Sequence, residues 1–243
     1  MALFTDGAIT SIEDLRAHDT QLLTVANVEG IDVTRKLELA QDEISVQVAG
    51  MLARQSAPPG IDQVVVTAPM KLWHAYRTLE MVYRDAYHNQ LNDRYSGKRD
   101  EYRTLAQWAY EQLMQVGLGI AADPMPQATA PQLGPAGGNL DDGTYYVSVA
   151  WTNAAGEEGR CSDPAAIQIS GSSFTVQIAG PGGVMGWNVY AGTDTSSMAL
   201  QNPTPLSPGE TWTQPAPLRA GRTAGTGQRP TYCLPVPRII QRG

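Results

Sequence analysis

Long apolar runs and paired cysteines are the first features that the sequence lacks. It contains no stretch of about 18 apolar residues, and its opening MALFTDGAITSIEDL has neither a basic start nor an apolar segment, which argues against a membrane span and a secretory leader. The two cysteines, Cys161 and Cys233, lack the spacing of zinc or redox motifs. Free thiols are the simpler interpretation, and one disulfide is the alternative.

Motifs of catalysis are also absent. The sequence has no GxSxG motif and no Walker loop, and the glycine-rich stretch 180–186 lacks the lysine and the following helix that a phosphate cradle needs. The three histidines, His18, His74 and His88, have no metal-binding spacing and are expected at the surface or at an interface. Neighbouring acidic residues are expected on solvated turns and helix faces. The sequence therefore favours a structural or binding protein, without catalytic residues, metal or cofactor, over an enzyme.

Proline and charge are distributed unevenly, which divides the chain. Only three of the 17 prolines precede residue 122. Residues 1–122 carry 16 acidic and 11 basic side chains, whereas residues 219–243 carry five arginines and no acid. We expect an α+β protein in two domains: an all-α bundle of about four helices over 1–122, a Pro/Ala/Gly-rich linker or first strand over 123–138, an antiparallel β-sandwich over 139–218 and a basic extended arm over 219–243.

Apolar residues in the first half recur at helical spacing. The expected helices are, in order, one from a capping box at Thr10 and Glu13 to Gly30, one from Asp32 to Met51, one from about Thr67 to Tyr87, and one from Lys98 to Val116 after a corner at 89–97. In the last of these, the buried stripe leaves Trp108 on the flank. The four apolar stripes must face one another or a neighbouring subunit, because a lone amphipathic helix gains little stability.

The second half alternates polar and apolar residues between turn signals. Strands are expected at 144–153, 165–170, 173–179, 186–191, 197–201 and 210–214. This spacing is typical of a sandwich of the immunoglobulin or fibronectin type III kind. Trp187 and Tyr190 are expected in its core, with Tyr145 or Tyr146 meeting them across the sandwich.

Aromatic residues concentrate between residues 73 and 110, among arginines. Tyrosine, tryptophan and arginine are enriched in the anchors of protein interfaces. The candidate interface residues are Trp73, Tyr83, Tyr87, Arg94, Tyr95 and Trp108. The alternative is that most of these rings form the core of the bundle; local acids make a single-strand nucleic-acid groove a weaker alternative.

The C-terminal residues suit an arm that becomes ordered on a partner. Such a segment is too short, and too rich in Gly and Pro, to build a core. The candidate docking residues are Arg219, Arg222, Arg229, Arg238, Ile239, Ile240 and Arg242. A solvated, untethered end is the alternative.

One stretch, 83–126, resembles the third and fourth helices of head-to-tail adaptor (connector) proteins of tailed bacteriophages. The resemblance rests on the segment LNDRY at 91–95, on Tyr102 to Trp108, and on the exit GLG at 117–119 before Asp123-Pro124. The second half, with GTYYVSVAWTNAAGEEGRCSDPAA and GWNVYAGT, resembles the immunoglobulin-like or fibronectin-like modules that phage structural proteins often carry.

This resemblance implies a virion protein of the neck, assembled in the host cytoplasm. It implies a homo-oligomeric ring, usually of twelve copies, that joins the portal protein at the portal vertex to a tail or stopper protein, with DNA passing through the lumen without sequence-specific binding and with no membrane partner. An acidic lumen would let DNA slide, because phosphate neutralisation by basic side chains is what makes DNA binding tight. The alternative is a carbohydrate- or host-surface-binding virion module, for which the candidate sugar platforms are Trp151, Trp187, Tyr190 and Trp212.

Overall fold

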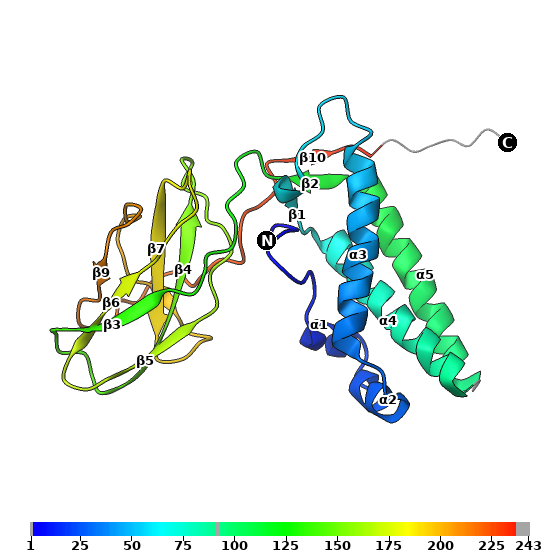
Figure 1. Cartoon of the computed structure of the whole chain (residues 1–243), viewed down its shortest axis with the longest axis horizontal. Helices are drawn as coiled ribbons and strands as arrows, with labels where there is room; N and C mark the ends of the chain where they lie inside the picture. The colour runs from blue at the N-terminus through cyan, green and yellow to red at the C-terminus, as the bar shows by residue number, and fades with distance from the viewer. Residues whose placement is uncertain (1, 91–92, 237–243) are drawn as a thin grey trace. The chain divides into compact units, whose positions relative to one another are not determined.

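The computed structural model describes residues 2–90 and 93–236 (Figure 1). It confirms the α+β class: within these residues, five α-helices of the N-terminal half precede antiparallel sheets. The chain divides into two compact units, and both are built from separated stretches. We call Met1–Asp6 with Ala121–Arg229 the β unit, and Gly7–Ile120 with Pro230–Gly243 the helical unit. This interleaving differs from the consecutive order of domains that the sequence predicts.

The first predicted helix is in fact two short helices. The helix α1 (Ile12–His18) begins at Ser11, whose hydroxyl accepts from the Asp14 amide while the Asp14 carboxylate accepts from the Ser11 amide. The capping box is therefore one residue later than the predicted box at Thr10 and Glu13. The helix α2 (Leu22–Glu29) ends at Gly30, whose φ of +64° is the left-handed conformation that glycine tolerates best.

The break between α1 and α2 lies at Asp19, which is buried. Its carboxylate accepts hydrogen bonds from the Gln21 amide at 2.9 Å, the Tyr83 hydroxyl at 2.8 Å and the Tyr102 hydroxyl at 2.9 Å. Burial, followed by these hydrogen bonds to Asp19, raises the pKa of both tyrosines. A buried carboxylate needs such donors, so Asp19 fixes the turn to the two long helices that carry the tyrosines.

The remaining helices follow the predicted stripes. The helix α3 (Val33–Leu52) is capped by Asp32, and α4 (Ala68–Gln90) has Pro69 in its first turn, both as predicted. The helix α5 (Asp93–Val116) starts earlier than the predicted Lys98, so part of the expected corner at 89–97 is helical.

Helices α3, α4 and α5 lie side by side, with α4 between the other two (Figure 1). The chain runs along α4 in the direction opposite to its direction in α3 and in α5: Arg77 pairs with Glu43 on one side, and Trp73 packs on Tyr110 on the other. One hydrophobic cluster packs α1 and α2 against the three long helices. Its buried residues are Leu15, Leu22, Ala26, Val33, Leu37, Ala75, Leu79, Val82, Tyr83, Ala86, Tyr95 and Tyr102.

A small antiparallel sheet completes the helical unit. Its order is β1 (Val64–Val65), β2 (Leu118–Ile120) and β10 (Tyr232–Leu234). The pairing of Ile120 with Tyr232 brings the two ends of the β-unit insertion together. Gly117, with a φ of +92°, permits this pairing, because a Cβ there would lie 2.5 Å from the Leu234 carbonyl oxygen. Part of the segment predicted as an extended arm is therefore a paired strand.

The β unit consists of two antiparallel sheets with the main core between them, and one of the sheets also carries a smaller buried cluster. One sheet has the order β3 (Gln132–Ala136), β6 (Ser173–Gln177) and β9 (Trp212–Thr213); the other has the order β5 (Ala165–Ile169), β4 (Gly143–Thr152), β7 (Gly186–Gly192) and β8 (Ala199–Leu200). Phe174 and Val176 of the first sheet share a cluster with Val149 and Trp187 of the second. The predicted core residue Trp187 is fully buried between the sheets, whereas Tyr190, also fully buried, lies in a separate cluster with Ala150 and Met198. The prediction that Tyr145 or Tyr146 meets these two rings across the sandwich is wrong, because β4 and β7 are neighbours in one sheet. Tyr145 packs on Phe174 of the other sheet, and Tyr146 packs against the Tyr190 cluster.

The stretch 123–138 belongs to the β unit. Residues 132–136 form a strand, which was one of the two alternatives, and Met125 and Ala128 are buried in the core. The Met125 amide donates to the Gln228 side chain, so a hydrogen bond links this stretch to the C-terminal residues of the β unit.

Candidate interaction surface

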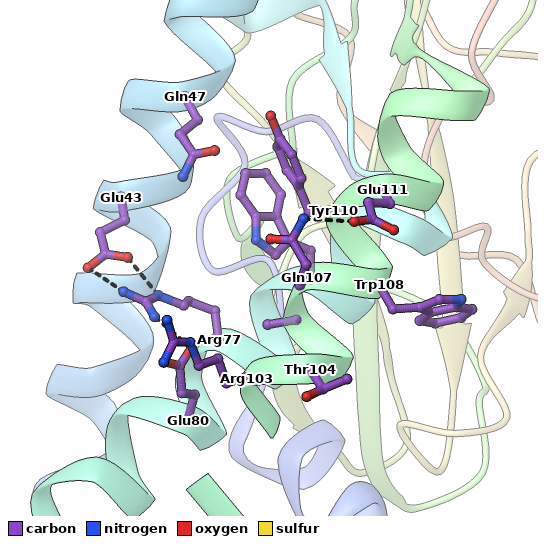
Figure 2. A pocket seen from close by; sticks show the side chains of 12 residues that line it. Glu43, Gln47, Arg77, Glu80, Arg103, Thr104, Gln107, Trp108, Tyr110 and Glu111 are labelled. Atoms are coloured by element: carbon purple, nitrogen blue, oxygen red, sulfur yellow. Dashed lines mark hydrogen bonds and ion pairs between the residues drawn. The ribbon is translucent and has the colours of Figure 1, made fainter. Parts of the chain in front are cut away.

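An open groove runs between α3 and α5, over α4 (Figure 2). Its volume is about 790 Å³. The lining residues are Glu43, Gln47, Trp73, Arg77, Glu80, Arg103, Thr104, Ala106, Gln107, Trp108, Tyr110 and Glu111. The groove exists because α3 and α5 both pack on α4, which leaves the space above α4 uncovered.

Arg77 organises the floor of this groove. Its Nε donates to Glu43 at 2.7 Å, and its Nη1 donates to Glu80 at 2.6 Å. The Arg77 side chain is only 25 % exposed and Glu80 is buried, so these charges are partly removed from water and need each other. The network ties α3 to α4 and uses three of the five N–H donors of Arg77.

Trp108 and Arg103 stand on the α5 side of the groove. Trp108 is 47 % exposed, and Figure 2 shows its ring pointing away from α3. Arg103 is exposed and forms no ion pair with any other residue that the structure describes. Figure 2 shows the Arg103 side chain directed toward Arg77, so Trp108 and Arg103 lie on different sides of α5. Both are residue types enriched in protein interfaces.

Three of the predicted interface residues are buried in the helical unit instead. Trp73, Tyr83 and Tyr95 are between 2 % and 5 % exposed. Tyr83 donates to Asp19, and the Tyr95 hydroxyl donates to Glu29 at 2.7 Å. For these three rings the alternative interpretation, a place in the core of the bundle, is confirmed. Their burial prevents them from acting as anchors of a protein interface.

The other predicted helical residues are partly accessible. Tyr87 is half-buried, with the Arg99 guanidinium 4.9 Å from its ring centre. Arg94 is exposed and lies over the Tyr95 ring. Trp108 remains the most exposed aromatic of the six, in agreement with its predicted place on the flank of the stripe.

The predicted docking arm divides between the units. Arg219, Arg222 and Arg229 are exposed on the β unit. The Arg219 amide donates to the Gln201 side chain, and the Arg222 guanidinium donates to Glu158. Arg238, Ile239, Ile240 and Arg242 lie outside the described residues.

Glu158 forms a polar cluster in the β unit that neither motif nor spacing predicted. Its carboxylate accepts from Arg222 at 2.6 Å and from the Tyr190 hydroxyl at 2.8 Å, and also from the Asn188 amide. Burial opposes its ionisation, but these hydrogen bonds outweigh burial and lower the pKa of Glu158. The cluster holds the returning chain near Arg222 on the β unit, where the sequence predicted an extended docking arm.

Both cysteines are free thiols, so the alternative of a disulfide is wrong. Cys161 belongs to the β unit and Cys233 to β10 of the helical unit. Burial, with a smaller contribution from Glu158, raises the pKa of Cys161 to about 12.

The candidate sugar platforms are mostly inaccessible. Trp151, Trp187 and Tyr190 are at most 2 % exposed, and Trp212 is half-buried against the core that contains Trp151 and Trp187. A ring can bind a sugar only through an exposed face. Of the four candidate platforms, only Trp212 therefore keeps part of its side chain accessible.

His74 differs from the prediction of a surface histidine. It is fully buried, 2.6 Å from the Thr10 hydroxyl and 3.0 Å from the Leu37 carbonyl oxygen. Burial lowers the pKa of His74, which favours the neutral ring. Among the residues that the structure describes, no group of three or more His, Cys, Asp or Glu side chains is arranged to hold a metal ion.

Comparison with models of protein families and with curated protein sequences yields no match. In the described part of the chain, no helix has both the length and the apolar character that crossing a bilayer requires.

Proposed function

We propose that this chain is a structural assembly protein: a head-to-tail adaptor of a tailed bacteriophage, which forms a ring between the portal and the tail and has no catalytic role. The observation that carries the proposal is the open surface of α3, α4 and α5 with Trp108 exposed on it. An ordered helical unit with an uncovered tryptophan is suited to bind another protein surface. The resemblance of 83–126 to adaptor helices supplies the kind of assembly.

The charge of the chain supports a passive contact with DNA. The formal net charge is −7 at pH 7, and the helical stretch 1–122 carries five more acids than bases. Tight binding to DNA requires basic side chains that release counterions. In this proposal the ring surrounds DNA without holding it.

In the same proposal, the residues beyond 236 contact the portal protein. Arg238, Ile239, Ile240 and Arg242 keep this predicted role, since the Arg222 guanidinium pairs with Glu158 within the β unit. The β unit, with its closed core, serves as an attached module on the virion neck.

The mass of the purified protein, measured by native mass spectrometry alone and after mixing with its portal protein, tests the proposal. We expect a ring that contains several copies, in at least the second measurement, and labelling at the portal vertex by immunogold electron microscopy of virions. A monomer under both conditions, or label at a fibre tip or baseplate, would overturn it.

A further inference from the structure

The groove between α3 and α5 has an apolar floor and polar walls. On the floor, Trp73 is 5 % exposed, and its ring centre lies 5.1 Å from that of Tyr110, which is half-buried. Figure 2 shows Tyr110 between the two walls, level with Gln47 of α3. Grooves with an aromatic floor and polar edges bind extended peptide segments, and prolines in such a segment lower the entropy that is lost on binding.

The charges of this groove are balanced at one end and unbalanced at the other. Its charged lining residues are Glu43, Arg77, Glu80, Arg103 and Glu111. Arg77 pairs with Glu43 and Glu80. Glu111 is exposed, accepts from the Gln107 side-chain amide at 2.9 Å and forms no ion pair with any other residue that the structure describes. Arg103 lies about 12 Å from Glu111 along the axis of α5, so the Glu111 end of the groove favours a cation.

The chain returns to the end of this groove at Leu234 and Pro235. A Cβ at Gly117, directly after α5, would lie 2.5 Å from the Leu234 carbonyl oxygen, so the two backbones are in contact. The Gln55 side chain, just beyond α3, donates to the Pro235 carbonyl oxygen at 3.1 Å. Because α3 and α5 run in the same direction, their C-terminal ends lie at the same end of the helical unit. Leu234 and Pro235 therefore contact the ends of both helices that form the walls of the groove.

The residues beyond 236 can reach the groove from this point. Glu111 lies six residues before Gly117, about 9 Å away along the axis of α5. Arg238 follows Leu234 by four residues, which span up to about 13 Å when extended. The two isoleucines that follow Arg238 therefore reach the level of Tyr110, which is next to Glu111 in α5.

The composition of this segment matches the groove. Residues 237–243, PRIIQRG, contain two isoleucines that suit the apolar floor, two arginines that can pair with Glu111, and no acid. Pro235 and Pro237 each restrict their own φ and favour an extended conformation in the residue before them. The short connection to Leu234 also gives the segment an effective concentration of about the millimolar range, so weak contacts are sufficient.

We infer that residues 238–240 bind in the groove of their own chain, with Arg238 on Glu111 and the two isoleucines over Tyr110. The contact lies within one subunit, so it does not require the ring of the proposed function. A second step rests on the proposed function: in the adaptor, the portal protein competes with the groove for Arg238, Ile239 and Ile240. The groove then holds these residues in the free subunit and releases them when the portal protein binds.

Engineered cysteines test the contact. In a Cys233→Ser background, which removes the exposed native thiol, Ile239→Cys with Gln47→Cys should form an intramolecular disulfide under mild oxidation, because Gln47 lines the groove. Ile239→Cys with Val46→Cys is the matched control, since Val46 is exposed at the same height of α3 but outside the groove. A segment bound in the groove should close the Gln47 disulfide about tenfold faster than the Val46 disulfide, because binding raises the local concentration of one thiol at the other. An unbound segment reaches both positions equally.

Mass spectrometry of the alkylated monomer measures both rates. Faster closure in the Gln47 pair supports the contact. Equal rates, or no disulfide within the monomer of the Gln47 pair, overturn it. Disulfide-linked dimers formed by the Gln47 pair alone would assign the groove to the segment of a second copy, which also overturns the contact within one chain.

Charge exchange tests the assigned ion pair. Glu111→Lys and Arg238→Glu should each slow closure of the Gln47 disulfide by about threefold at low salt, an effect of the size expected for an exposed ion pair. The double variant should recover most of the rate. Glu111→Lys should stay folded, because Glu111 is exposed. Unchanged rates in both single variants contradict the pairing of Arg238 with Glu111.

Portal binding distinguishes the contact from the proposed function. If the wild type binds its portal protein, the oxidised Gln47 pair should bind it about tenfold more weakly, because the arm is held in the groove, and reduction should restore binding. Equal binding by the oxidised and reduced forms overturns the competition. Portal binding by a wild type whose Gln47 variant forms no disulfide overturns the contact and leaves the proposed function standing. A Gln47 disulfide in a chain that binds no portal protein supports the contact and overturns the proposed function.

Discussion

Both units bury aromatic rings, but they differ in the surfaces that they leave uncovered. In the β unit, Trp187 and Tyr190 are fully buried, and Arg222 lies 5.6 Å from the Tyr190 ring centre while it pairs with Glu158. In the helical unit, Trp108 and Arg103 remain exposed on α5. The large rings of β7 are buried within the β unit, whereas the helical unit leaves Trp108 exposed on its open side.

This difference shows that aromatic and arginine content alone does not locate an interface. Strand β7 is covered on both faces, by the main core around Trp187 and by the cluster around Tyr190, so both rings are buried. A helix in a single layer is covered on one side, so the position of a ring around the helix decides its exposure. The interface signal of the sequence is therefore correct only for residues outside the buried stripe.

The largest expected effect comes from matched tryptophan substitutions. Trp187→Ala should destabilise the β unit by about 3–5 kcal/mol, the usual cost of removing a buried aromatic side chain. Trp108→Ala should change the stability of the helical unit by less than about 0.5 kcal/mol, as at ordinary surface sites. Urea denaturation followed by circular dichroism measures both. Similar losses in the two variants would remove the distinction between a closed and an open unit.

Asp19→Ala is expected to have an effect of comparable size. It leaves the buried hydroxyls of Tyr83 and Tyr102 without their acceptor, and hydrogen bonds to a charged group contribute about 1.5–3 kcal/mol each. The helical signal at 222 nm should therefore be lost at clearly lower urea concentration. Asp42→Ala, an exposed carboxylate on α3, is the control and should melt like the wild type at a concentration where the chain is monomeric. A normal midpoint for Asp19→Ala would contradict the role given to the α1–α2 break.

Mild acid should lower the stability of the helical unit more than that of the β unit, by less than the substitutions above. Burial lowers the pKa of His74 in the folded chain. As pH falls below the usual value of 6.5, His74 binds a proton in the unfolded chain but stays neutral in the folded chain, so the helical unit loses stability. The pKa of Glu158 is also lowered, so the β unit keeps its contribution until pH falls below the usual 4.5.

The midpoint of the helical transition should thus decrease between pH 7.5 and pH 5.5, while the β unit changes little. His74→Leu should reduce this pH dependence, and His88→Gln, at an exposed position, should preserve it. A pH dependence that persists in His74→Leu would assign it to another group.

The smallest effect is expected from removing the β unit altogether. The Thr231 amide donates to the Ile120 carbonyl at 2.7 Å, so a short Gly/Ser loop can join Ile120 to Pro230 after Met1–Asp6 and Ala121–Arg229 are deleted. The shortened chain should keep a cooperative helical transition with nearly the same midpoint. A chain without such a transition would show that the helical unit depends on the β unit.

Regular periodicity predicted much of the fold. The stripe of α3 from Val33 to Met51 is buried as expected, because its spacing matches the helix over five turns. The strand β4 was likewise found from the alternation in 144–153. In both cases the pattern lies within the element itself, so the element can be predicted without knowing its partners in the fold.

The features that escaped prediction depend on distant partners. The turn at Asp19 requires donors from Tyr83 and Tyr102, and β10 requires β2, with which it shares no sequence pattern. The candidate surface was predicted in part. Periodicity placed Trp108 beside the stripe, but the concentration of aromatic residues among arginines also suggested Tyr83 and Tyr95, whose burial follows from how the helices pack.

The place of β10 also determines the order in which the chain becomes complete during synthesis. The chain emerges from the ribosome N-terminus first, so β1 and β2 are available long before Tyr232–Leu234 exists. Throughout that interval β2 has one edge without its neighbour, while the whole β unit is translated and has time to fold. The edge of β2 that pairs with β10 therefore stays unpaired until the end of the chain is synthesised. Early release of the chain would leave that edge open to pair with another molecule.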